Sequence, residues 1–172
     1  GYSDVYVVKT NPLGDTLWTQ TIGGTLIDKG NCVIETSDSN IVIAGLTNTV
    51  NDSTQAYVIK LNNNGILLWD SIYGGVGYED FNAIIETNDG NYVSVGAITE
   101  VSTINDKDFY VYKIDTEGVE IWESVSPGVG EEIGYDVLEL LNGSLFIVGP
   151  TEATGAGGKD AKIFLLTPGG FW

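Results

Sequence analysis

The sequence contains no histidine and no methionine, it has no arginine, and its 172 residues include a single cysteine, Cys32. Without histidine the chain cannot build a Ser-His-Asp or Cys-His catalytic centre, and it cannot bind zinc through imidazole. One cysteine forms neither an intrachain disulfide nor a CxxC metal site. These absences exclude many nucleophilic and zinc-dependent enzymes, and sulfur chemistry indicates no compartment.

Positive charge is scarce as well. The seven basic residues are all lysines and face 24 acidic residues, which gives a formal net charge of −17 at pH 7. Proteins bind nucleic acids and anionic lipids through lysine and arginine, so this chain would repel both. No apolar run of about 18 residues is present, so we expect no membrane insertion. Cations and neutral glycans remain as small partners.

What the sequence does contain is an internal repeat, in which two segments alternate. The first segment occurs as DVYVVKTNPLGDTLW (4–18), QAYVIKLNNNGILLW (55–69), DFYVYKIDTEGVEIW (108–122) and a shortened DAKIFLLTPGGFW (160–172). The second occurs as VIETSDSNIVIAGLT (33–47), IIETNDGNYVSVGAI (84–98) and VLELLNGSLFIVGPT (137–151). Trp18, Trp69 and Trp122 are 51 and 53 residues apart, so the period is roughly 50 residues.

The repeat predicts an all-β fold. Each period offers four short runs of strand-forming residues, which in the middle repeat are FNAIIET, NYVSVGA, FYVYKI and VEIWESV. Runs such as NIVIAG and SLFIVG are apolar on both faces, which favours sheets packed on two sides. We therefore expect β-propeller blades of four antiparallel strands in a single domain, 1–172, with about three and a half repeats of roughly 50 residues. Their approximate bounds are 1–29 (half a blade), 30–79, 80–132 and 133–172.

The ends of such an array should expose unpaired sheet edges, which proteins rarely leave uncovered. The sequence therefore predicts that other copies of the chain, or further repeats of the same protein, cover these edges.

Glycine marks the loops of the repeat. Gly74-Gly75 recurs as Gly23-Gly24 and, more loosely, as Pro127-Gly128, always beginning five residues after a tryptophan. Because no helix is expected to follow, these pairs are interpreted as connections between strands and not as phosphate loops. Asp89-Gly90 and Asn142-Gly143 lie between strand runs, where we expect tight type I′ hairpin turns, with Asp38-Ser39 as a less regular version.

Repeated acidic residues are the candidate metal ligands. Asp28, Glu79 and Glu132 occupy equivalent loop positions, and equivalent positions in a propeller lie on a ring that could hold Ca²⁺. A second set, Glu35, Glu86 and Glu139, lies in one strand of each repeat. We expect the strand acids to accept hydrogen bonds from backbone N–H groups or to pair with the repeated lysines, because an unpaired charge between blades is costly. Those lysines are Lys9, Lys60 and Lys113.

The aromatic residues divide into those that recur with the repeat and those that do not. Tyrosines and tryptophans that repeat in register are predicted to pack between blades: Tyr6, Tyr57, Tyr110, Trp18, Trp69 and Trp122. Tyr73 and Tyr78 break the repeat beside the glycine loop, so they are the candidates for stacking against a sugar.

The pattern D-x-Y-V-x-K, G-x-x-x-W, a glycine pair and E-T-x-D-G-N-Y-V-x-V-G resembles the propeller repeats of secreted and surface proteins of Bacteroidetes-type bacteria. Kelch and PQQ-type propellers are more distant relatives in this resemblance. It implies an extracellular or cell-surface location and a non-enzymatic role in adhesion, scaffolding or ligand display. The open sheet edges add self-assembly to these roles, and we expect no cofactor. Two alternatives are a carbohydrate-binding surface module and a glycoside hydrolase that uses paired acids.

Overall fold

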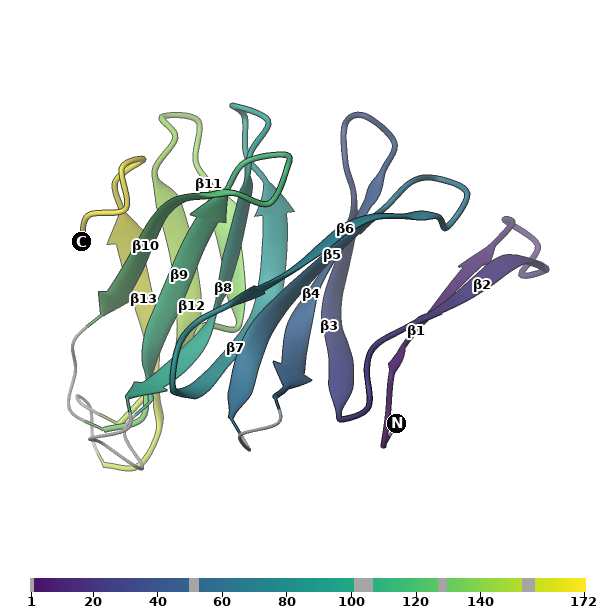
Figure 1. Ribbon diagram of the computed structural model, residues 1–172. Coiled ribbons are helices and arrows are strands. Elements are labelled where there is room, and N and C mark those ends of the chain that lie inside the picture. Colours follow the sequence, from purple (N-terminus) through teal and green to yellow (C-terminus); the bar gives the residue numbers. More distant parts are fainter. Residues whose placement is uncertain (1, 50–52, 101–106, 127–129, 153–156) are drawn as a thin grey trace.

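The computed structural model describes residues 2–49, 53–100, 107–126, 130–152 and 157–172 (Figure 1). These residues form thirteen β-strands and no helix, which confirms the predicted all-β class. It follows that the described part of the chain contains no helix long and apolar enough to cross a membrane.

The strands fall into four consecutive units that match the sequence repeat. Unit 1 contains β1 (Val5–Thr10) and β2 (Thr16–Ile22); unit 2 contains β3 (Asp28–Glu35), β4 (Ile41–Asn48), β5 (Thr54–Leu61) and β6 (Leu67–Tyr73). Unit 3 contains β7 (Gly77–Glu86), β8 (Tyr92–Glu100), β9 (Asp108–Ile114) and β10 (Glu120–Ser126); unit 4 contains β11 (Asp136–Glu139), β12 (Leu145–Thr151) and β13 (Asp160–Leu166). Figure 1 shows the units following one another across the molecule, from purple to yellow.

Within each unit the strands pair antiparallel with their sequence neighbours. Units 2 and 3 are joined by one parallel bridge, Thr54 opposite Tyr78, so their eight strands count as one sheet. Units 1 and 4 form separate sheets of two and three strands. The described strands form no closed ring, and the two termini lie at opposite sides of the molecule in Figure 1.

Apolar side chains fill the space between each pair of neighbouring units. One cluster joins Val5 and Ile22 of unit 1 to Ile59 of unit 2. A second joins units 2 and 3, and a third joins units 3 and 4. Since alternate residues of a strand point to opposite faces, each inner unit contributes one set of side chains to the unit before it and the other set to the unit after it.

The tryptophans link each unit to the next. The indole N–H of Trp18 donates to the Asn63 carbonyl at 3.1 Å, and that of Trp69 donates to the Thr116 carbonyl at 3.0 Å. The Trp18 and Trp69 rings also lie against the turn glycines Gly65 and Gly118. The predicted packing of these tryptophans between units is confirmed.

The hairpin turns differ from the prediction. Type I′ requires positive φ at both central residues, yet Asp89 is not among the described non-glycine residues with positive φ. Instead the Gly90 N–H donates to the Thr87 carbonyl at 2.8 Å, and Gly90 has φ of 82°. This is a type I turn followed by a left-handed glycine. The type I′ prediction was wrong because it required positive φ at Asp89 as well as at Gly90, and only Gly90 has it. Asn142-Gly143 shows the same pattern.

Gly90→Ala should therefore lower the free energy of unfolding by about 1 kcal/mol, because an L-residue is strained at this φ. No atom lies within 4 Å of the position of the added methyl group, so steric crowding does not contribute. Gly75→Ala is the matched control, since its surroundings are equally open and its φ is not in the left-handed range. Urea unfolding of both variants checks the prediction, which fails if they lose equal stability.

Candidate functional site

The predicted loop acids Asp28, Glu79 and Glu132 are buried, with exposed fractions of 4%, 2% and 0%. The predicted loop position was wrong for two of them, because Asp28 begins β3 and Glu79 lies near the start of β7. Each bonds to its own loop or strands. Asp28 Oδ2 accepts from the Gly24 N–H at 2.8 Å, and the Gly75 N–H bonds to Glu79. Glu132 Oε1 accepts from Thr151 Oγ1 at 2.9 Å and from Lys162 Nζ at 2.7 Å. Asp28 and Glu79 thus bind the loops that precede their strands, whereas Glu132 binds two strands of unit 4.

The glycine pairs have a structural explanation in the same contacts. Gly74 has φ of 117°, and a Cβ added to it would lie 2.7 Å from a carboxylate oxygen of Glu79. At Gly23 the same construction meets the carboxylates of Asp28 and Asp4 at 2.5 and 2.7 Å. The loop can therefore pack against the acidic side chain only if the residue at this position is glycine. Pro127-Gly128, the third predicted pair, lies outside the described residues.

The structure does not gather the predicted ring of acids into a metal site. Among the described residues, no group of three or more Asp, Glu, His or Cys side chains is close enough to hold an ion. Asp28, Glu79 and Glu132 are instead distributed one to a unit boundary, at the points where units 1 and 2, 2 and 3, and 3 and 4 meet.

The strand acids act between units as expected. Glu86 of unit 3 accepts from the Ser37 N–H at 2.6 Å and from Ser37 Oγ at 2.7 Å, in the first turn of unit 2. Glu139 of unit 4 accepts from the Asn88 N–H at 2.6 Å, in the equivalent turn of unit 3. Glu35 is exposed, and no hydrogen bond joins it to any described residue. The predicted bonding to backbone N–H groups is confirmed for Glu86 and Glu139.

The repeated lysines pair with aspartates in the turn between the first two strands of their own unit. Lys60 Nζ lies 3.5 Å from Asp38, and Lys113 Nζ lies 2.6 Å from Asp89. The Thr36 hydroxyl, with smaller contributions from Asn40 and Lys60, lowers the pKa of Asp38 to about 2. The sequence analysis missed these pairs, although Lys and Asp each recur at fixed repeat positions.

The two tyrosines proposed for sugar binding have different surroundings. Tyr73 is only 7% exposed, its hydroxyl donates to the Gly118 carbonyl at 2.8 Å, and burial raises its pKa to about 12. Its ring packs against Tyr112 at 4.9 Å and presents no open face to a sugar. Tyr78 is partly buried, its hydroxyl donates to Asp80 Oδ2 at 2.7 Å, and the Lys107 ammonium lies 4.0 Å from its ring centroid.

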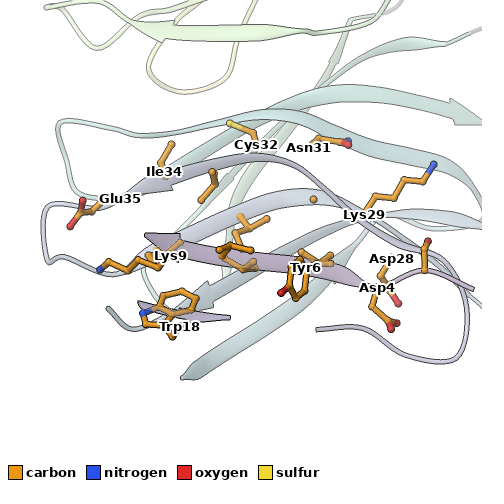
Figure 2. Close-up of a pocket in the computed structure, with 18 residues that line it drawn as sticks. Asp4, Tyr6, Lys9, Trp18, Asp28, Lys29, Asn31, Cys32, Ile34 and Glu35 are labelled. Carbon is orange, nitrogen blue, oxygen red and sulfur yellow. The ribbon is translucent and has the colours of Figure 1, made fainter. Parts of the chain in front are cut away.

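A groove of about 730 Å³ lies between β1 of unit 1 and β3 of unit 2. Figure 2 shows Lys9, Trp18 and Glu35 toward one end of it, and Asp4 and Asp28 together at the other. Apolar side chains from β1, β3 and β4 also line it: Val5, Val7, Cys32, Ile34 and Ile43. The sequence did not predict this groove, because it depends on how two units pack.

Comparison with known proteins adds no assignment to this geometry. No family model matches the sequence, and no curated protein matches it.

The buried carboxyl of Glu79 should give the stability a distinct pH dependence. Burial raises its pKa, and the bond from the Gly75 N–H opposes the shift only in part. The folded state therefore holds the proton more tightly than the unfolded state, so the contribution of Glu79 to stability increases as pH falls. In thermal unfolding, Glu79→Gln should have a higher midpoint temperature than the wild type at about pH 8, and this difference should become smaller toward about pH 5.

Asp38→Asn is the control of opposite sign, because the pKa of Asp38 is lowered to about 2. In the wild type, the contribution of Asp38 to stability is complete above the pKa of the unfolded state and is lost only as pH falls through the lower pKa of the folded state. The loss of stability in Asp38→Asn should therefore be the same from about pH 8 to about pH 5. A Glu79→Gln difference that does not vary with pH would contradict the prediction.

Proposed function

We propose that the chain is a segment of a β-propeller and works as a non-enzymatic structural and interaction module that associates with further units of the same kind. The observation that carries the proposal is the state of the two outer faces. Side chains that the inner units bury are exposed at both ends of the array.

The outer face of unit 1 contains Tyr6, which is 64% exposed, whereas the equivalent Tyr57 and Tyr110 of units 2 and 3 are 5% and 0% exposed. These two tyrosines pack against the preceding unit. Val8 of unit 1 is 45% exposed, whereas its equivalents Ile59 and Tyr112 are 1% and 6% exposed.

Unit 4 shows the same feature on its opposite face. Ile163 is 59% exposed, whereas its equivalents Val58 and Val111 are fully buried against the following unit. Leu138 and Leu165 extend this apolar face. Contiguous exposed apolar surface of this kind is typical of interaction sites. The two ends are complementary. Unit 4 exposes the face that inner units pack against the following unit, and unit 1 exposes the face that inner units pack against the preceding unit.

The contacts between units support the propeller arrangement. The first strands of units 2, 3 and 4 lie in sequence, with β3 contacting β7 and β7 contacting β11. In a propeller the first strand of each blade is expected to lie nearest the central axis, where neighbouring blades converge.

An extracellular or cell-surface location is part of the proposal and rests on the resemblance of the repeat to bacterial surface proteins. The composition supports a non-enzymatic role, because a chain without histidine lacks the commonest general base. Asp28 and Glu132 each accept hydrogen bonds within their own loop or unit.

The purified chain should form particles larger than 18.4 kDa, because end-to-end contact would bury the apolar faces of units 1 and 4. Light scattering behind size exclusion measures the mass. Raising the salt from about 0.05 M to about 0.5 M should increase association, since screening reduces repulsion between chains of charge −17.

The double variant Ile163→Asp, Leu165→Asp should be monomeric, because it introduces charge into the outer face of unit 4. Leu141→Asp is the matched control, since Leu141 is fully exposed at a turn tip and away from that face. A wild-type chain that stays strictly monomeric at both salt concentrations would contradict the proposed association.

A further inference from the structure

β1 has one unpaired edge in the described structure. It pairs with β2 along one side only. The equivalent strands of the next two units are paired on both sides: β5 lies between β4 and β6, and β9 lies between β8 and β10. The groove between β1 and β3 therefore borders an open row of backbone donors and acceptors.

The equivalent space in units 2 and 3 is filled by the unit's own inner hairpin, which consists of its first two strands. In unit 2 this is β3–β4 with its turn at Asp38, and in unit 3 it is β7–β8 with its turn at Asp89. Each inner hairpin bonds to its surroundings through three repeated contacts, and the groove contains the equivalent of each.

The first contact is the lysine of the third strand. Lys60 and Lys113 each bind a turn aspartate of their own inner hairpin. Lys9 is their equivalent, and its ammonium bonds to the Asn63 carbonyl of unit 2 at 3.3 Å, as Lys60 does to Thr116 of unit 3. No acidic group among the described residues pairs with Lys9.

The second contact is the strand glutamate of the following unit. Glu86 and Glu139 accept the N–H group of the residue that precedes the turn aspartate, in Ser37 and Asn88. Glu35 is their equivalent and lines the groove at the same end as Lys9, as Figure 2 shows. Lys9 and Glu35 thus offer one cation and one acceptor to a single turn.

The third contact is an asparagine in the first strand of the inner hairpin. Asn31 donates to the Phe81 carbonyl at 2.9 Å, and Asn82 donates to the Gly134 carbonyl at 3.0 Å. The equivalent acceptor in the groove is the carbonyl of Gly30, and Gly30 is an exposed residue.

We propose that the groove between β1 and β3 binds a β-hairpin in trans, one with apolar strands, an asparagine in the first strand and an aspartate in the turn. The second strand of the hairpin adds to the free edge of β1, with its glycine opposite Tyr6, as Gly45 lies opposite Tyr57. Lys9 binds the turn aspartate, and Glu35 accepts the preceding N–H. The inference rests on the proposed role as an interaction module and names the partner of one of its ends.

A second folded copy of this chain does not supply such a hairpin. In such a copy, the turn aspartates of units 2 and 3 are already paired with Lys60 and Lys113. The backbone N–H groups of Ser37 and Asn88 already donate to the glutamates of the next unit. The remaining inner hairpin, β11–β12, has Asn142 at the aspartate position and its second strand is paired with β13. The partner is therefore a hairpin from a repeat outside this chain.

The test uses a head-to-tail cyclised peptide with residues 81–97, which holds the hairpin of unit 3 together with Asn82 and Asp89. Fluorescence anisotropy of the labelled peptide should show saturable binding to the intact chain. Lys9→Gln and Glu35→Ala should each weaken binding about tenfold, because each removes a bond to a charged group. Lys29→Gln is the matched control, since it removes the same charge at the far end of the same groove.

A charge exchange separates recognition from general damage to the fold. Lys9→Glu should abolish binding of the native peptide, and a peptide with Asp89→Lys should bind Lys9→Glu and not the wild type. Equal losses in Lys9→Gln and Lys29→Gln, or no rescue by the exchange, would overturn the proposal.

The mass measurement distinguishes a failure of the hairpin site from a failure of the proposed association between copies. Particles larger than 18.4 kDa together with no peptide binding would overturn the hairpin site and leave the module intact. Peptide binding by a strictly monomeric chain would support the hairpin site and contradict association between copies.

Discussion

The structure depends on covering both apolar faces of every sheet. Val58 and Ile59 are adjacent in β5 and both are buried, one against unit 3 and the other against unit 1. A sheet of this kind is stable only between two others, so the repeat generates a series of units. The same requirement explains why the end units, which have a neighbour on one side only, expose apolar side chains.

Polar contacts fix how each unit sits on the next. Trp18 and Trp69 donate to turn carbonyls of the following unit, and Glu86 and Glu139 accept from turn N–H groups of the preceding one. Apolar packing tolerates sliding, whereas these bonds are directional and are satisfied in one arrangement. Because the donors and acceptors recur with the repeat, equivalent bonds recur along the array: the tryptophan bond from unit 1 to unit 2 and from unit 2 to unit 3, and the glutamate bond from unit 3 to unit 2 and from unit 4 to unit 3. This regularity is the basis on which Lys9, which has no acidic partner among the described residues, and Glu35 are matched to a specific turn.

The polar contacts of the described residues stabilise the units and their packing on one another. Asp28 and Glu79 bind the loops that precede their strands, the lysines hold the inner turns, and Tyr73 bonds across a unit boundary. The two ends differ from the inner units, because unit 4 has an apolar face without a neighbour and unit 1 has a groove with a free strand edge among the described residues. Both features suit a protein that binds other β-structure.

The sequence by itself determined the repeat, the strand positions and the two-sided packing, because these follow from local periodicity and from apolar residues on both faces. It also indicated that the strand glutamates bond to backbone. Only the tertiary structure decided which unit they reach, since Glu86 and Ser37 are 49 residues apart in the chain. The burial of Tyr73, the separation of Asp28, Glu79 and Glu132, and the groove depend in the same way on how one sheet is placed against another. Local sequence specifies which side chains face outward from a strand, but contacts between units arise only when two such faces meet.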